Sequence, residues 1–264
     1  MNFIMKTSEF YSIIKYNNGK MVDNPDDIAV EYSLDVYVNG QKFVRLLCTP
    51  KSLKSLCLGF LRSEGIIESD GDVESFHFDE EECSAFIETR KDDKIFGIEE
   101  KKLNVVGTSK GMVSEDIYGK NFKQTENEAD NIARDVDFKK LLETVERFGQ
   151  MSELFKNTGC AHSCGAGSVG NIEVFEDDIG RHNALDKVVG SCMLRGIDTS
   201  KVILFLSGRV SSEMLLKALG GGFRAVVSRS APTNAAVDIA RKNGIFLCGF
   251  AREDKINIYS GFPS

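Results

Sequence analysis

The stretch VILFLSGRVSSEMLLKAL, residues 202–219, determines the fold class. Its apolar residues 202–206 are typical of a buried strand, the residues 207–209 form a small polar junction, and residues 211–219 have the spacing of an amphipathic helix. The same order recurs along the chain, with strand-like segments at 171–175, 225–228 and 245–248 and helical patterns at 183–195 and 233–242. This alternation predicts an α/β fold, a layered sheet with helices on both faces.

The upstream sequence predicts a smaller, strand-rich part. Residues 30–38 alternate between apolar and polar, Asn39-Gly40 follows, and residues 43–48 are again apolar, which together predict a β-hairpin. Thr49-Pro50 predicts the start of a helix with Thr49 as its N-cap, and Gly65 predicts its end. Residues 70–100 predict further short strands joined by acidic turns.

These patterns predict three segments. Residues 1–113 form the strand-rich N-terminal part, the polar residues 114–135 form a mobile linker, and residues 136–264 form an α/β domain. The last segment begins with a predicted helix from Asp137 to Phe148, and a second predicted helix covers residues 151–155.

Composition excludes several classes of protein. The 264 residues carry a net charge of −7, which argues against sequence-independent nucleic-acid binding. The longest apolar runs are too short to span a bilayer, and residues 1–20 have no secretory pattern, so we expect a soluble, cytoplasmic protein. Seven scattered cysteines are not a disulfide framework. Four of them lie in apolar, periodic segments and are expected to be buried: Cys48, Cys57, Cys192 and Cys248.

Polar junctions follow three of the predicted strands. They cover residues 177–183, 207–209 and 228–233, and each combines Gly, Ser or Thr with an arginine. Because helix N-termini at strand ends favour anions, these junctions predict a phosphate-binding rim that includes Arg181 and His182, with Lys187 one turn further on. Each junction also has a structural interpretation, in which Ser207 or Thr233 caps a helix and the arginines pair with surface carboxylates.

Two thiols and one imidazole lie within five residues, at Cys160, His162 and Cys164. A thiolate carries or attacks sulfur, and a neighbouring imidazolium lowers the pKa of a thiol, so one hypothesis is a persulfide-bearing or redox-active cysteine. A second is metal binding by these three residues, although their spacing matches no common zinc motif. A third is that these small residues simply pack at the start of a helix.

Several motifs occur in the order found in a known family: Val38-Asn39-Gly40, Thr49-Pro50, residues 58–65 (LGFLRSEG), 176–187 (EDDIGRHNALDK), 207–214 (SGRVSSEM), 230–233 (SAPT), 249–252 (GFAR) and 257–259 (NIY). In these motifs, and over nearly its whole length, the chain resembles the FdhD/NarQ type of formate dehydrogenase accessory protein. The resemblance implies a homodimer with a fold like the cytidine deaminases. It also implies that sulfur passes from a cysteine desulfurase to the molybdenum cofactor of formate dehydrogenase, bis-molybdopterin guanine dinucleotide.

The resemblance and the junctions together predict a pocket for the guanine nucleotide of that cofactor, or for a GDP-like nucleotide. The predicted residues are Arg181, His182, Asn183, Lys187, Ser207, Gly208, Arg209, Ser230, Thr233, Phe250, Ala251, Arg252, Glu253, Asp254 and Lys255.

One departure from the family pattern concerns the sulfur-carrying C-x-x-C pair, because Lys110 and Val113 stand in its two positions. We therefore hypothesise that Cys160 or Cys164 handles the sulfur, with His162 setting its protonation state. The alternative is a chaperone that binds the cofactor without sulfurtransferase activity, so the sequence leaves open whether the chain is an enzyme. A zinc deaminase is excluded, because His-x-Glu followed by Pro-Cys-x-x-Cys is absent.

Overall fold

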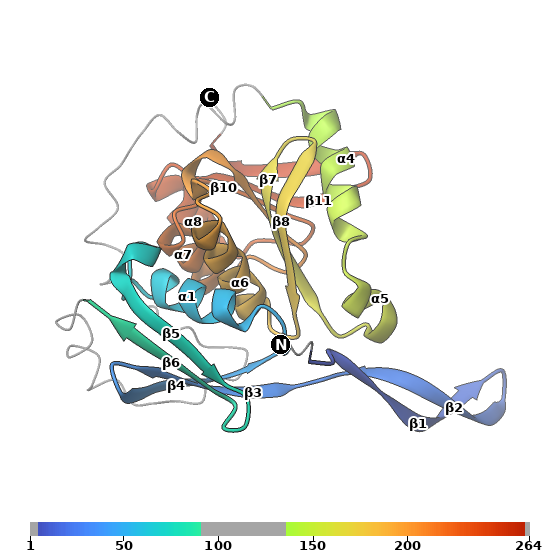
Figure 1. Cartoon of the computed structure of the whole chain (residues 1–264). Helices are drawn as coiled ribbons and strands as arrows, with labels where there is room; N and C mark the ends of the chain where they lie inside the picture. Colours follow the sequence, from blue (N-terminus) through green and yellow to red (C-terminus); the bar gives the residue numbers. More distant parts are fainter. Residues whose placement is uncertain (1–4, 91–135, 262–264) are drawn as a thin grey trace.

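A six-stranded sheet forms the centre of the structure, a computed structural model that describes residues 5–90 and 136–261 (Figure 1). The strand order is β12-β11-β10-β9-β7-β8. β8 to β11 run parallel to one another, while β7 and β12 are antiparallel to their neighbours. The carboxyl ends of four strands therefore lie at one edge of the sheet, and the predicted α/β alternation is confirmed. The strands are β7 His162–Ser168, β8 Asn171–Asp178, β9 Ile203–Leu206, β10 Ala225–Ser228, β11 Phe246–Arg252 and β12 Lys255–Ser260.

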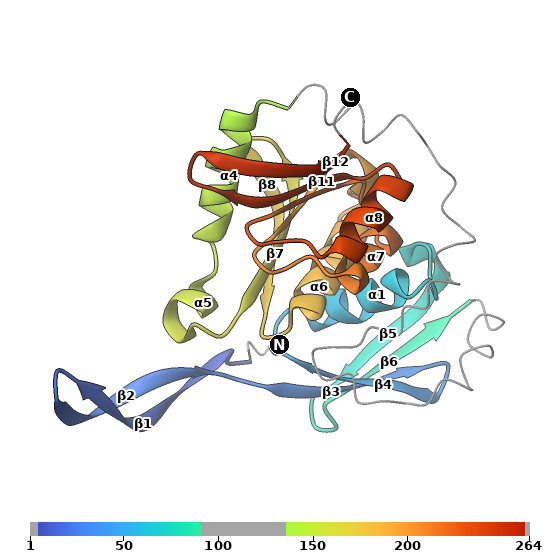
Figure 2. The ribbon, with the colours of Figure 1, turned by 180° about the vertical axis from the view of Figure 1, so that it is seen from behind.

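Helices cover both faces of this sheet (Figures 1 and 2). On one face, buried residues of three helices pack against Leu204, Val226 and Leu247. On the other face, a single long helix packs Leu141 and Phe148 against the opposite side chains of the same strands. The first three helices are α6 Arg181–Leu194, α7 Ser212–Gly220 and α8 Asn234–Lys242; the second face has α4 Phe138–Gly149, followed by the short α5 Glu153–Thr158.

The N-terminal part adds a four-stranded sheet and one helix, α1, which lies between that sheet and α6. The helices α1 and α6 approach very closely, because a Cβ at Gly59 would overlap the carbonyl oxygen of Asp186 and one at Gly190 would overlap that of Ser55. Glycine is therefore required at both positions. The elements, in the order of the sheet, are β4 Gln41–Cys48, β3 Tyr32–Val38, β6 Ser84–Thr89 and β5 Val73–Asp79, with α1 at Leu53–Ser63.

The predicted hairpin at Asn39-Gly40 is confirmed, with both residues at positive φ, and Gly65 follows the end of α1 at φ 74°. The predicted N-cap was wrong: α1 is preceded by Ser52, and the Thr49 hydroxyl instead accepts a hydrogen bond from the amide of Ile179 (3.1 Å). The predicted linker 114–135, the residues Lys110 and Val113, and the predicted strands beyond residue 90 lie outside the described residues.

Several strands were not predicted, among them β12 at the edge of the main sheet. A two-stranded ribbon precedes the four-stranded sheet, with β1 at Ser8–Asn17 and β2 at Lys20–Ala29. In addition, β7 is a strand, whereas one interpretation placed its first residues at the start of a helix. β7 has small residues of low β-propensity, and its pairing with β8 and β9 decides its conformation.

Candidate functional site

The three polar junctions lie together at the carboxyl edge of the six-stranded sheet, after β8, β9 and β10. β7 begins at the same edge, because His162 is paired with Asp178, the last residue of β8. The turn from β11 to β12 extends from that edge as well. We call this group of loops the carboxyl-end rim. The sequence predicted the junctions, but it did not predict that His162 joins them.

Basic side chains gather around Gly208 in this rim. A Cβ at Gly208 would lie 3.2 Å from His162 Nδ1 and 3.9 Å from the Cβ of Arg181, so a larger residue there would press on the imidazole. Burial lowers the pKa of His162 below its ordinary value, and the nearby charges of Arg181 and Arg209 lower it further. His162 is therefore an uncharged imidazole at neutral pH, in a field created by two guanidinium groups. An anionic ligand would be stabilised at this point.

The serines of the rim hold its backbone in place. The Ser207 hydroxyl accepts a hydrogen bond from the amide of Ser163 (2.8 Å), and the Ser228 hydroxyl donates to the carbonyl oxygen of Gly208 (2.7 Å). Thr233 caps α8 by accepting from the amide of Ala236 (3.3 Å). The structural interpretation as a helix cap is confirmed for Thr233 and wrong for Ser207, because Ser211 caps α7 and Ser207 binds the backbone of β7.

The end of β11 supplies an aromatic ring and a further guanidinium group. The amide of Phe250 donates to the carbonyl oxygen of Ser230 (3.0 Å), and Phe250 has a φ of 50°, which is uncommon for a bulky residue. The guanidinium carbon of Arg252 lies 5.7 Å from the centre of the Phe250 ring. Among the other predicted residues of this stretch, Ala251 is buried in the core against α4, while Glu253, Asp254 and Lys255 are exposed.

His182 is buried directly beside the rim, in the first turn of α6. Its Nε2 lies 3.7 Å from Oε2 of Glu213, which belongs to the first turn of α7 and is partly exposed. This pair links the starts of two helices that follow adjacent junctions. Glu213 was not among the predicted site residues, since its proximity to His182 depends on how α6 and α7 pack.

Two predicted ligand residues have structural contacts instead. The Lys187 ammonium is fully buried, 2.7 Å from Asp178 Oδ2, and also donates to the carbonyl oxygen of Thr49 (3.0 Å). The Asn183 amide donates to Asp178 Oδ1 (3.0 Å) and to the carbonyl oxygen of Leu47 (2.7 Å). Both residues therefore fasten the N-terminal part to α6 and do not extend to the rim surface. The sequence alone does not distinguish a polar residue that is buried for structural reasons from one that binds a ligand, which is why both were predicted as ligand residues.

The acidic run at the end of β8 has the same anchoring role. Glu176 accepts a hydrogen bond from the Ser52 hydroxyl (2.7 Å), and Asp177 accepts one from the Ser152 hydroxyl (2.8 Å). Asp178 accepts from the amide of Thr49 (2.9 Å). Three consecutive carboxylates thus bind the segment before α1 and the N-cap of α5 to the strand from which the rim begins.

The two thiols near His162 differ in their exposure to solvent. Cys160 is exposed, directly after the left-handed Gly159 that ends α5. Cys164 is 2% exposed in the core of β7, and burial raises the pKa of its thiol well above the ordinary range. We correct the prediction accordingly: Cys164 is a core residue, and Cys160 is the thiol available to a reactant. Cys160, His162 and Cys164 do not come together as a group of three potential metal ligands, and no such group occurs within residues 5–90 and 136–261.

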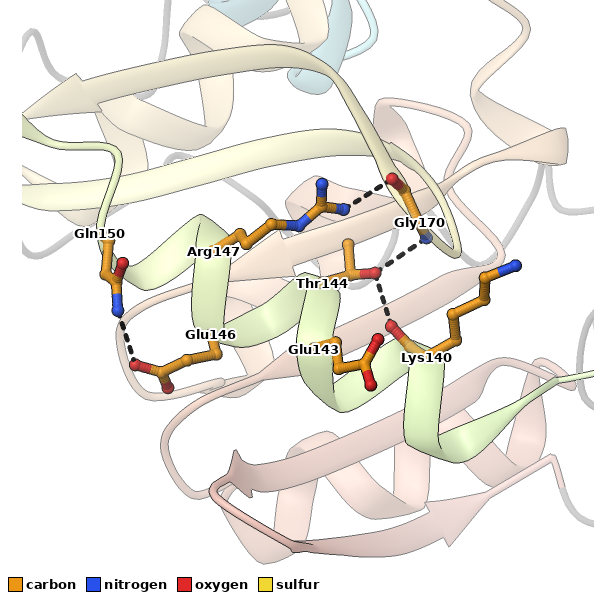
Figure 3. A pocket seen from close by; sticks show the side chains of 7 residues that line it. All are labelled: Lys140, Glu143, Thr144, Glu146, Arg147, Gln150 and Gly170. Carbon is orange, nitrogen blue, oxygen red and sulfur yellow. Dashed lines mark hydrogen bonds between the residues drawn. The ribbon is translucent and has the colours of Figure 1, made fainter.

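A separate depression of about 520 Å³ lies along α4, away from these residues (Figure 3). Its lining mixes acidic and basic side chains. Arg147 and Thr144 hold the β7–β8 turn by hydrogen bonds with the backbone of Gly170 (2.6 and 2.8 Å). These contacts account for the conformation of the turn and identify no ligand. Among the helices that the structure describes, none combines the length and the apolar character that crossing a bilayer requires.

The fold and the rim define an α/β protein with a basic site at the carboxyl edge of its main sheet. The sequence matches the FdhD/NarQ family over residues 29–263, and the chain belongs to this family.

Similar proteins agree with this assignment. The sulfur carrier protein FdhD of Bacillus licheniformis is 35% identical over 248 residues, which cover 94% of this chain and 93% of that protein. The protein of the same name from Listeria innocua is 34% identical and covers 94% of this chain and 95% of its own. A crystal structure of a putative formate dehydrogenase accessory protein from Desulfotalea psychrophila shares the fold, with a TM-score of 0.78, 21% identity and 97% of both chains covered.

Proposed function

We propose that this chain is a sulfur carrier for the maturation of formate dehydrogenase. In this role it binds bis-molybdopterin guanine dinucleotide as its client at the carboxyl-end rim and passes sulfur to it from a cysteine desulfurase in the cytoplasm. The names of the similar proteins support the sulfur-carrier role. The observation that carries the binding role is the convergence of His162, Arg181 and Arg209 around Gly208.

The client is a polyanion, and the rim suits such a ligand. Arg181 and Arg209 supply guanidinium groups that recognise phosphate oxygens through paired hydrogen bonds. The uncharged His162 adds a hydrogen-bonding group without a further charge. Phe250 and Arg252 add planar groups beside Ser230, on which a purine base can stack. We propose that the guanine nucleotide end of the client, or a GDP-like nucleotide, occupies this region.

Cys160 is the proposed sulfur carrier. It is exposed, and only Ala161 separates it from His162, so the two residues are at most about 7 Å apart along the extended chain. In the proposed step, the Cys160 thiolate attacks the outer sulfur of the persulfide on the desulfurase. A new S–S bond forms on Cys160, the old S–S bond breaks, and the desulfurase cysteine leaves as a thiolate, without net oxidation. In this proposal His162, uncharged at neutral pH, accepts the thiol proton.

Binding is tested by titrating the full chain with GDP in a calorimeter. The variants Arg181→Gln and Arg209→Gln should each bind GDP about tenfold more weakly, because each removes a charge-assisted hydrogen bond. Arg195→Gln is the matched control, since Arg195 bonds the carbonyl oxygen of Glu173 (3.0 Å) at the far end of α6. Equal affinity of all four proteins for GDP would contradict the proposed site.

Sulfur loading is tested by incubating the chain with a cysteine desulfurase and cysteine, followed by peptide mapping in a mass spectrometer. The peptide that contains Cys160 should gain one sulfur atom, and Cys160→Ser should abolish the gain. Cys83→Ser is the control, because Cys83 is half-buried in the turn between β5 and β6.

A second candidate function is a cofactor-binding chaperone without sulfur transfer. The observation that favours it is the pair Lys110 and Val113 at the positions of the family's C-x-x-C, since neither side chain can form a persulfide. Absence of a sulfur adduct on every cysteine, combined with normal GDP binding, would select this alternative. In either role we propose that the chain acts as a homodimer and that formate dehydrogenase receives the client.

A further inference from the structure

The β1–β2 ribbon projects from the body of the protein and joins neither of the larger sheets (Figures 1 and 2). Its two ten-residue strands are paired along their full length, from Ser8 opposite Ala29 to Asn17 opposite Lys20. The turn between them has Asn18 and Gly19 at positive φ, as expected for a tight hairpin. A two-stranded hairpin alone is only marginally stable in water, so this ribbon calls for a surface that covers it.

One face of the ribbon is an apolar stripe. Directly paired residues of antiparallel strands share a face, so Tyr16 and Met21 lie side by side, and the alternation of β1 places Phe10 and Ile14 on the same face. These four side chains are between 70% and 78% exposed, and none belongs to a core cluster of the described residues. We call Phe10, Ile14, Tyr16 and Met21 the ribbon stripe.

The opposite face is mixed: Tyr11, Val22 and Ile28 are exposed on it beside the ion pair of Lys15 and Asp26. The ribbon thus holds seven of the ten exposed large hydrophobic side chains in the part of the chain that the structure describes. Monomeric proteins rarely leave so contiguous an apolar surface in water, and such surfaces mark sites of association.

We propose that this ribbon is an arm that packs onto a second copy of the chain. The inference rests on the proposed homodimer and names the surface that forms it. The four side chains of the ribbon stripe are between 70% and 78% exposed. They offer roughly 600 Å² per copy, most of the area of about 800 Å² that one partner contributes to a stable interface of standard size.

The free edge of the ribbon also indicates that the partner of the arm is a second copy of the chain. β1 has ten residues without proline, so its outer edge presents unpaired backbone groups, whereas the outer edge of β2 is interrupted by Pro25. An unprotected edge is a template for another strand, and two copies of the same edge can pair antiparallel about a twofold axis. The acidic Asp23 and Asp27 lie on the face of the stripe, so an anionic membrane is disfavoured as the occupant.

The test compares association of the full-length chain and of Ile14→Thr/Tyr16→Thr by analytical ultracentrifugation. Threonine removes the apolar surface but keeps a high propensity for strands. The wild-type chain should be a dimer, and the double variant should dissociate at least about 100-fold more readily, because two apolar side chains per copy are lost. Leu194→Gln is the matched control, since Leu194 is an exposed apolar residue at the end of α6, and it should leave the dimer unchanged.

The outcomes separate the inference from the proposed function. A monomeric wild-type chain would overturn both the homodimer and the arm. A dimer that persists equally in the double variant would overturn the arm alone, as would binding of the wild-type chain to vesicles of phosphatidylcholine and phosphatidylglycerol through the stripe. As a measurement without substitutions, hydrogen exchange of the β1 amides should slow as the wild-type concentration rises. Exchange that is independent of concentration would contradict the arm.

Discussion

Lys187 and Asp178 form an ion pair with a distance of 2.7 Å in which both side chains are fully buried. The pair joins the middle of α6 to the end of β8, and the Thr49 backbone completes it from the N-terminal part. Removal of one partner leaves an uncompensated charge in the interior, whereas the intact pair adds little net stability over an apolar pair.

Lys187→Met should therefore lower the free energy of unfolding by about 3–5 kcal/mol, as measured by urea denaturation. Lys51→Met is the control, because Lys51 is half exposed at 3.4 Å from Asp177 and its loss should cost less than about 1 kcal/mol. Similar losses in the two variants would show that the buried pair has no special role.

The close contact between α1 and α6 leads to a second prediction, which concerns stability. Gly190→Ala should destabilise the chain by more than the 1–3 kcal/mol or so that is typical of overpacking, because the added methyl group meets the backbone of Ser55 and not a flexible side chain. Thermal unfolding measures the loss. At Gly71 a Cβ would meet only Ser69 Oγ at an ordinary 3.5 Å, so Gly71→Ala should leave the midpoint nearly unchanged.

The buried group Glu64, Asp186 and Lys217 predicts a dependence of stability on pH. Burial raises the pKa of Glu64 above its ordinary value near 4.5. The ammonium of Lys217, at 3.3 Å, acts in the opposite direction, and the repulsion by Asp186 raises the pKa further. A carboxyl group whose pKa is raised by folding stabilises the folded state below its unfolded pKa, and this contribution is lost as the pH rises through the folded pKa.

In the Glu64→Gln variant the side chain at position 64 cannot ionise, so the variant should not lose stability in this way as the pH rises. The difference in urea midpoint between Glu64→Gln and the wild-type chain should therefore shift in favour of the variant as the pH rises from 4 to 8, a range that begins just below the ordinary pKa. The exposed Glu88→Gln serves as the control. A difference that stays constant with pH would contradict the prediction.

The thiols should differ in reactivity in the native state. Cys160 should be alkylated by iodoacetamide well before Cys164, because alkylation needs an accessible thiolate, and burial both shields Cys164 and raises its pKa. Peptide mapping after short exposures measures the order. After unfolding in urea the two thiols should react alike, and equal rates in the native chain would contradict the buried position of Cys164.

Much of the α/β architecture could be predicted, because its strands and helices are buried on one side or both and burial imposes a periodic pattern. The segment 202–219 shows this well: its strand and its helix occur where the pattern placed them. The ribbon was missed for the same physical reason. Its side chains are mostly exposed on both faces, so no alternation between apolar and polar residues marks it. Asn18-Gly19 is the one local signal that could have indicated a tight turn.

The candidate site could be predicted only in part. Residues that follow a strand end, such as Arg181 and Arg209, could be assigned to a common edge because parallel strands bring their ends together. The proximity of His162 to Gly208 depends on the pairing of β7, which its small residues did not indicate. The burial of Lys187 depends on a backbone segment 138 residues away, and no local pattern reveals such a partner.

The three carboxylates at the end of β8 have a consequence for how the two parts of the chain respond to each other. α6 and its rim residue Arg181 begin directly after the carboxylates that hold the segment before α1, so the rim and the N-terminal part share one set of anchors. Binding at the rim and opening of the N-terminal part are then thermodynamically linked. A ligand that binds the rim more tightly while these anchors are intact would stabilise α1 and its sheet, and local unfolding of that sheet would weaken the binding of the ligand by the same free energy.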